Sequence, residues 1–157
     1  MEAVKYLAVA LGSYLLGSVS LSIYMSRKMY GGDVRSKGSG NAGATNMARV
    51  YGMSAGFLTL GADVLKAVIS MGAGYLLLGD MGLSLGGICC IVGHCFPVFY
   101  GFKGGKGVSV GGALSLMLDW RVGLLVIACF LLGAFLSKKV SLGSVLGALA
   151  AGIGPFI

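Results

Sequence analysis

Long uncharged stretches alternate along the chain with short segments rich in glycine and basic residues. The six stretches span residues 6–25, 54–79, 81–102, 107–118, 122–137 and 140–157. A helix needs about 20 apolar residues to cross about 30 Å of hydrocarbon, and the stretches lack the period of two of barrel strands. The pattern therefore predicts about six transmembrane helices. The short stretches 107–118 and 122–137 are expected to form a broken or glycine-kinked pair around residues 119–121.

Composition supports a membrane protein. Of 157 residues, 57% are hydrophobic and only 11% are charged, which is too few charges to coat a soluble globule. Disorder is excluded because it requires low hydrophobicity. The 29 glycines favour close helix packing. The sequence thus predicts an all-α integral membrane protein, a glycine-rich polytopic helix bundle forming one transmembrane domain over residues 1–157.

Basic residues are distributed unevenly between the two sets of connections. With the N-terminus outside, the inner connections carry nine basic residues against one acid, Asp33. The basic residues are Arg27, Lys28, Arg35, Lys37, Arg49, Lys103, Lys106, Lys138 and Lys139. Because lysine and arginine concentrate on the cytoplasmic side, we predict that the N-terminus lies outside. Six crossings return the C-terminus outside, and the last apolar stretch carries no polar tail, so we expect that a C-terminal segment is missing.

The first inner connection contains a glycine-rich segment. Its G-x-G-x-x-G pattern (Gly38, Gly40 and Gly43) follows a membrane helix rather than a strand, which excludes a dinucleotide-binding fold. Glycines still allow backbone N–H groups to converge on an anion, and Arg49 can bind two phosphate oxygens. Short polar side chains within and just after the segment are Ser39, Asn41, Thr45 and Asn46. We predict a phosphate site rather than a flexible basic loop held against anionic lipid.

A second polar segment follows the third apolar stretch. Lys103 and Lys106 flank Gly104 and Gly105, but Gly107 stands where a nucleotide P-loop has Ser or Thr. Phosphate binding is again favoured over a positive-inside connector, because a connector would not explain the glycines. The nearby His94 is more typical of a structural hydrogen-bonding residue than of a general base. A His-x4-Asp acyltransferase is excluded, since Phe99 occupies the aspartate position.

Other polar residues are fewer. Asp63 and Lys66 lie three apart on one helix face, where mutual neutralisation is expected. Ser141 and Ser144 begin the last predicted helix, where N-terminal amides favour an anion. The four cysteines have no metal-ligand spacing and the chain has a single histidine, so we expect buried free thiols and no metal site. No cofactor is expected either.

These segments together resemble the bacterial acyl-phosphate-dependent glycerol-3-phosphate acyltransferases, the PlsY family. The matching residues are 38–41, 43–46, 93–94, 97–99, 101–108, 140–142 and 144, and the resemblance covers the whole chain. Members have seven transmembrane helices with the N-terminus outside. Their seventh helix leads to a cytoplasmic His-Arg-x-Asn-type motif, and this chain stops before it. The resemblance implies that loss of that segment would impair folding or activity.

The resemblance implies transfer of a fatty acyl group from acyl phosphate to glycerol 3-phosphate, an early step of bacterial phospholipid synthesis. It assigns catalysis to Ser39, Arg49, Lys106 and Ser144. Residues expected to bind substrate phosphate or to lie nearby are Gly38, Gly40, Asn41, Thr45, Asn46, His94, Lys103, Gly104, Gly105 and Ser141. The expected location is the bacterial inner membrane, with the site facing the cytoplasm.

Expected partners are the two substrates, the lipid bilayer and an enzyme that produces acyl phosphate, but no nucleic acid. Because acyl phosphate is already activated, the glycerol hydroxyl could attack it directly, with a substrate phosphate oxygen accepting the proton. The alternative is a small organophosphate transporter, although the two halves show no internal repeat. A lipid-binding scaffold would leave both glycine–lysine segments without a purpose.

Overall fold

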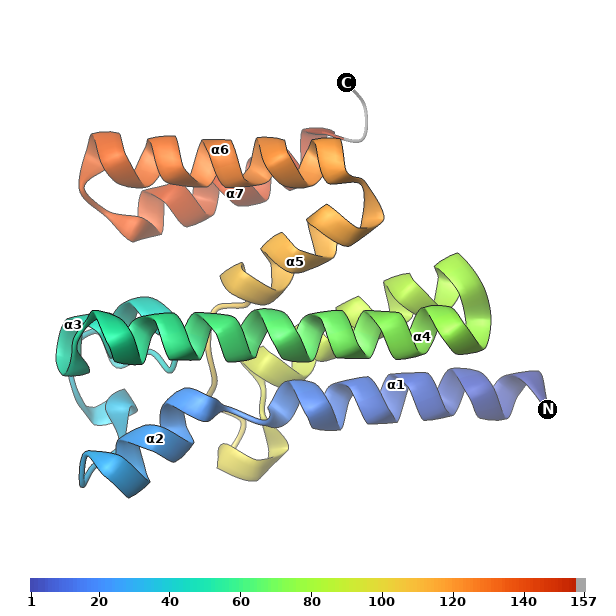
Figure 1. The fold of residues 1–157 in the computed structure, drawn as a ribbon, viewed down its shortest axis with the longest axis horizontal. Coiled ribbons are helices and arrows are strands. Elements are labelled where there is room, and N and C mark those ends of the chain that lie inside the picture. Colours follow the sequence, from blue (N-terminus) through green and yellow to red (C-terminus); the bar gives the residue numbers. More distant parts are fainter. Residues whose placement is uncertain (155–157) are drawn as a thin grey trace. The chain divides into compact units, whose positions relative to one another are not determined.

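The computed structural model describes residues 1–154, and all regular structure in that range is helical (Figure 1). The elements are α1 (Glu2–Ser18), α2 (Leu21–Met29), the 3-10 turn η1 (Val34–Ser36), α3 (Ala44–Tyr51), α4 (Met53–Cys95), the 3-10 turn η2 (Val98–Tyr100), α5 (Val108–Leu118), α6 (Trp120–Ser137) and α7 (Val140–Ile153). Contacts divide the chain into two compact units, Met1–Val110 and a second unit that begins at Gly111. The predicted all-α fold is confirmed.

The first predicted helix is broken in two. Val19 is extended, and Ser20 caps α2 by accepting a hydrogen bond from the backbone N–H of Ile23 at 3.5 Å. This break follows from the capping preference of serine, whose side chain replaces a missing helical partner. The apolar stretch 6–25 therefore forms most of α1 and the start of α2 rather than one continuous helix.

The second and third predicted helices form one element, α4, which reverses direction at Gly79. Its φ of 60° and ψ of −145° suit a residue without a Cβ atom. The two limbs, residues 53–78 and 80–95, then pack against each other, and Gly74 and Gly82 meet backbone to backbone. The third helix ends at Cys95, earlier than its apolar stretch, because residues 96–107 form a loop.

Within residues 1–154, three helical segments are long and apolar enough to cross a membrane: Glu2–Met29, Met53–Tyr100 and Trp120–Ser137. The second of these contains both limbs of α4. Two shorter apolar helices, α5 and α7, match the predicted stretches 107–118 and 140–157 over the described residues. The number of crossings and the outside position of the N-terminus remain predictions.

Glycines bring α1 against the second limb of α4. A Cβ atom on Gly17 would overlap the backbone oxygen of Cys90, and one on Gly93 would overlap that of Tyr14. In the second unit, Gly133 and Gly143 bring α6 and α7 together in the same manner. The prediction of close helix packing through small residues is confirmed.

The α1–α4 contact predicts the effect of adding one methyl group. Gly17→Ala should lower the free energy of unfolding by about 1–3 kcal/mol, because two backbones must separate to admit the new Cβ. Gly12→Ala on the same helix is the control, since a methyl group at Gly12 would meet no other atom within 4 Å. Thermal unfolding in detergent measures both variants. Equal midpoints would contradict the packing described.

Candidate active site

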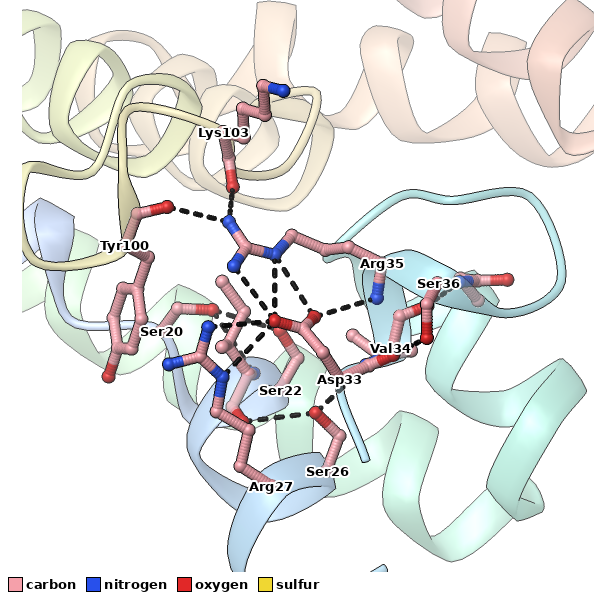
Figure 2. Close-up of polar contacts among 12 residues, drawn as sticks. Ser20, Ser22, Ser26, Arg27, Asp33, Val34, Arg35, Ser36, Tyr100 and Lys103 are labelled. Carbon is pink, nitrogen blue, oxygen red and sulfur yellow. Dashed lines mark hydrogen bonds and ion pairs between the residues drawn. The ribbon is translucent and has the colours of Figure 1, made fainter. Parts of the chain in front are cut away.

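Both predicted phosphate segments lie at one end of the first unit. The first loop (residues 30–43) connects α2 to α3, and the second loop (residues 96–107) connects α4 to α5. The Arg35 side chain of the first loop donates hydrogen bonds to the backbone oxygens of Tyr100 and Lys103 in the second (Figure 2). Two segments that are about 65 residues apart in the sequence are therefore adjacent in space.

The first loop is organised by the buried side chain of Asn46. Its Oδ1 accepts from the backbone N–H of Ser39 at 2.9 Å. Its Nδ2 donates to the backbone oxygens of Val34, Lys37 and Asn41 at 3.2, 3.0 and 2.9 Å. The sequence predicts that Asn46 contacts substrate phosphate, but its Nδ2 donates to three carbonyls of the loop and its Oδ1 accepts from the backbone of Ser39. The geometry gives it the task of holding the loop in shape.

Two glycines allow this fold of the first loop. Gly38 and Gly40 have φ values of +58° and +73°, and a Cβ atom on Gly38 would overlap the Asn46 Oδ1. Gly40 donates its N–H to the Lys37 backbone oxygen, and Gly43 donates its N–H to the Asn41 side chain at 2.8 Å. These amides are consequently used inside the loop.

Three of the predicted ligands remain exposed. Ser39, Thr45 and Arg49 make no side-chain hydrogen bond within residues 1–154. Arg49 lies one turn after Asn46 on α3, as the spacing suggested. The exposed hydroxyls and guanidinium are therefore the donors that the first loop (Ser39) and α3 (Thr45 and Arg49) can offer to an anion.

The second loop is packed onto His94. The N–H groups of Gly104 and Gly105 donate to the backbone oxygens of Cys95 and His94, both at 3.0 Å. A Cβ atom on Gly104 would overlap the His94 oxygen, and one on Gly105 would overlap the imidazole Nε2. The glycines thus have a packing reason that the sequence did not reveal. Lys103 and Lys106 remain exposed as the loop's cationic groups.

A buried polar cluster lies below the second loop. Asp63 Oδ1 is 3.0 Å from Lys66 Nζ and 3.2 Å from His94 Nδ1, and the two nitrogens are 3.0 Å apart. Lys66 also donates to the Val19 oxygen, and Ser109 donates to Asp63 Oδ2. The predicted Asp63–Lys66 pair is confirmed, and His94 joins it as a hydrogen-bonded member.

A cluster around Asp33 was not anticipated from the sequence. Its carboxylate accepts from Arg27 Nε and Nη2, and from the Arg35 backbone, Nε and Nη2 at 2.8–3.2 Å (Figure 2). The Arg35 guanidinium holds the pKa of Asp33 below its ordinary value. The feature of the sequence that points to this cluster is that Asp33 is the one acid in the inner connections, which also hold nine basic residues.

The remaining predicted residues belong to the second unit. Ser141 and Ser144 lie in the first two turns of α7, as predicted. The Ser144 hydroxyl donates to the Val140 oxygen at 2.9 Å. Ser141 lines a pocket of about 400 Å³ together with Ser137, Lys139, Leu142 and Val145. Across residues 1–154, no three His, Cys, Asp or Glu side chains are grouped to hold a metal, and all four cysteines are free thiols.

Comparison with known proteins decides the family. A family model described as glycerol-3-phosphate acyltransferase matches residues 7–157. This chain belongs to that family. A glycerol-3-phosphate acyltransferase of Finegoldia magna is 39% identical over 138 residues, which cover 88% of this chain and 70% of the relative. One from Jannaschia sp. is 43% identical over 147 residues, covering 94% and 72%.

Solved structures agree with the family assignment. Crystal structures of PlsY (YgiH), an integral membrane glycerol 3-phosphate acyltransferase, match with TM-scores of 0.89 for the glycerol 3-phosphate form and 0.83 for the lysophosphatidic acid form. Sequence identities are 33% and 34%, and each match covers 96% of this chain and 76% of the other. Together with the apolar helices, these matches make this acyltransferase an integral membrane protein.

The buried cluster yields a prediction about stability. Lys66→Met should lower the free energy of unfolding by about 3–5 kcal/mol, because it leaves the Asp63 carboxylate without its cation. The control is the double variant Asp63→Asn with Lys66→Met, which removes both charges and should cost less than Lys66→Met alone. Thermal unfolding in detergent provides the comparison. A double variant no more stable than the single one would mean that charge pairing is not what stabilises the cluster.

Proposed function

We propose that this acyltransferase uses acyl phosphate as its donor and glycerol 3-phosphate as its acceptor. The observation that carries the proposal is the direct contact between the two loops, which brings the exposed Ser39 and Arg49 to the same end of the unit as Lys103 and Lys106. The acceptor and product agree with the forms in which the PlsY neighbours were solved. A donor that carries a second phosphate group agrees with the second group of cations, Lys103 and Lys106.

The charge balance of the loops supports two anionic substrates. Asp33 is engaged by Arg27 and Arg35, so it leaves the other basic groups unneutralised. Within residues 1–154, no carboxylate lies within ion-pair distance of Arg49 or Lys106. Two phosphate groups repel each other, and positioned cations between them reduce that repulsion and orient both groups.

In the proposed reaction, the glycerol hydroxyl attacks the acyl carbon of the donor. A new ester C–O bond forms, the acyl C–O bond to phosphate breaks, and inorganic phosphate leaves with its bonding electrons. A phosphate oxygen of the substrate accepts the hydroxyl proton. Arg49 and Lys106 hold the phosphates, Ser39 donates a hydrogen bond to them, and the family resemblance assigns Ser144 to the same catalytic group. No enzyme nucleophile is needed, and positioning of the two substrates supplies much of the acceleration.

The proposed location is a bacterial inner membrane with the site facing the cytoplasm. Lysines and arginines concentrate in the connections assigned to that side, including both loops. Glycerol 3-phosphate is charged and reaches the site from water, whereas the acyl chain of the donor is apolar and partitions into the bilayer. Such a donor is supplied by an enzyme that joins a fatty acyl group to phosphate.

The proposal predicts acceptor-dependent release of phosphate. Purified protein should release inorganic phosphate from palmitoyl phosphate only when glycerol 3-phosphate is present. Arg49→Ala should reduce this rate by about 100-fold or more, because a charged phosphate contact is lost. Arg121→Ala, which removes an exposed arginine stacked on Trp120 in the other predicted set of connections, is the matched control and should stay near the wild-type rate.

Two results would contradict the proposal. An acyl-enzyme intermediate trapped with palmitoyl phosphate alone would show that a side chain attacks first. Uptake of glycerol 3-phosphate into proteoliposomes without phosphate release would favour the transporter instead.

A further inference from the structure

Each loop is attached separately to its neighbouring helix. In the first loop, Val34 donates its N–H to Ser26 Oγ at 3.1 Å, and the Ser22 hydroxyl donates to the Ala42 oxygen. In the second loop, Val98 donates to Ser18 Oγ at 3.3 Å, and the Tyr14 hydroxyl donates to the Phe96 oxygen at 2.9 Å. These bonds set each loop on its own helix but do not set one loop against the other.

Arg35 makes that connection. Its Nη1 donates to the backbone oxygens of Tyr100 at 2.7 Å and Lys103 at 2.8 Å (Figure 2). Among the hydrogen bonds found in residues 1–154, these two are the ones that join the first loop to the second. The Arg35 side chain is only 19% exposed, so water competes weakly for these contacts.

Asp33 aims the guanidinium of Arg35. Its carboxylate accepts hydrogen bonds from Nε and Nη2 of Arg35 at 2.8–3.2 Å, and Nη1 is thereby directed at the second loop. The backbone N–H of Arg35 also donates to Asp33, so both ends of the residue are held by one carboxylate. A planar guanidinium can bind a carboxylate on one edge and two carbonyls from another nitrogen, whereas an ammonium group has no such fork.

The contacts of Arg35 are close to the proposed phosphate ligands in sequence. Arg35 lies four residues before Ser39, and its acceptor Lys103 lies three residues before Lys106. A shift of one loop against the other would therefore move the donors that hold the two phosphates. Misplacement of reacting groups by about 1 Å can reduce a rate by about 100-fold.

We infer that Arg35 is a positioning residue for acyl transfer, which holds the first loop against the second so that both phosphates are bound in one geometry. This inference rests on the proposed function. In this assignment Arg35 itself contacts no substrate, because each of its three guanidinium nitrogens already donates to Asp33 or to the two carbonyls.

The test compares Arg35→Lys with Arg27→Lys. Arg27 binds the same Asp33 carboxylate, and its guanidinium lies over the Tyr100 ring, 5.8 Å from its centroid. Both variants keep the charge and the trypsin site, but only Arg35→Lys removes the hydrogen bonds between the loops. Arg35→Lys should lower kcat/KM by about 10- to 100-fold, with kcat reduced and KM for glycerol 3-phosphate raised. Arg27→Lys should stay within about twofold of wild type.

A second readout follows the loops without relying on activity. Trypsin cleavage after Lys103 and Lys106, followed by mass spectrometry, should be several times faster in Arg35→Lys than in wild type or Arg27→Lys. The thermal unfolding midpoint should be similar in all three proteins, because each loop keeps its own helix contacts. Equal effects of the two variants, unchanged cleavage, or a lowered midpoint with normal kinetics would each overturn the inference. Absence of phosphate release in the wild type would contradict the proposed function, and the cleavage rates would still test the connection between the loops.

Discussion

The buried ion pair of Asp63 and Lys66 is the constraint on which the first unit depends. A charge in an apolar helix bundle is costly unless a partner and further hydrogen bonds satisfy it. Here the partners come from three places in the chain: the next turn of α4, His94 near the end of the second limb, and the Val19 oxygen at the break between α1 and α2. Satisfying two charges thus fixes the relative position of three segments.

The second loop depends on that arrangement, since the loop packs on the imidazole ring of His94, which the cluster holds in place. Gly104 and Gly105 lie so close to His94 that no side chain would fit at either position. Arg35 then links the second loop to the first through its hydrogen bond to the Tyr100 oxygen. Within the first loop, Asn46 holds the backbone in place with four hydrogen bonds. The helices support the loops, and hydrogen bonds from side chains, rather than hydrogen bonds between backbone groups, determine how the two loops contact each other. The exposed groups are left for the ligand.

The sequence predicted the features that repeat along the chain and missed those that depend on single tertiary contacts. The apolar stretches predict the positions of most helices closely, because the length of an apolar stretch can be read from the local sequence. The break at Val19 and Ser20 was missed, since Ser20 stands within an uncharged stretch and its cap is visible only in three dimensions. The sequence predicts that the glycines of the second loop bind an anion, yet their close neighbour is His94, ten residues before Gly104. In the sequence Arg35 is one of nine basic residues in the inner connections. Its role is not visible there, because its acceptors are backbone oxygens, which carry no sequence signal.

The absence of free negative charge in the two loops has the same physical basis as their proposed role. The first loop needs a residue that accepts one N–H group and donates to three carbonyls, and Asn46 does this without a charge. An aspartate there would repel three carbonyl oxygens and any phosphate nearby. The loop's one acid, Asp33, is covered by two guanidinium groups, which keep it ionised and shield its charge. The Asp33 carboxylate thus orients Arg35, and its own charge is neutralised by the two guanidinium groups. The electrostatic potential around the exposed Arg49 and Lys106 therefore stays positive.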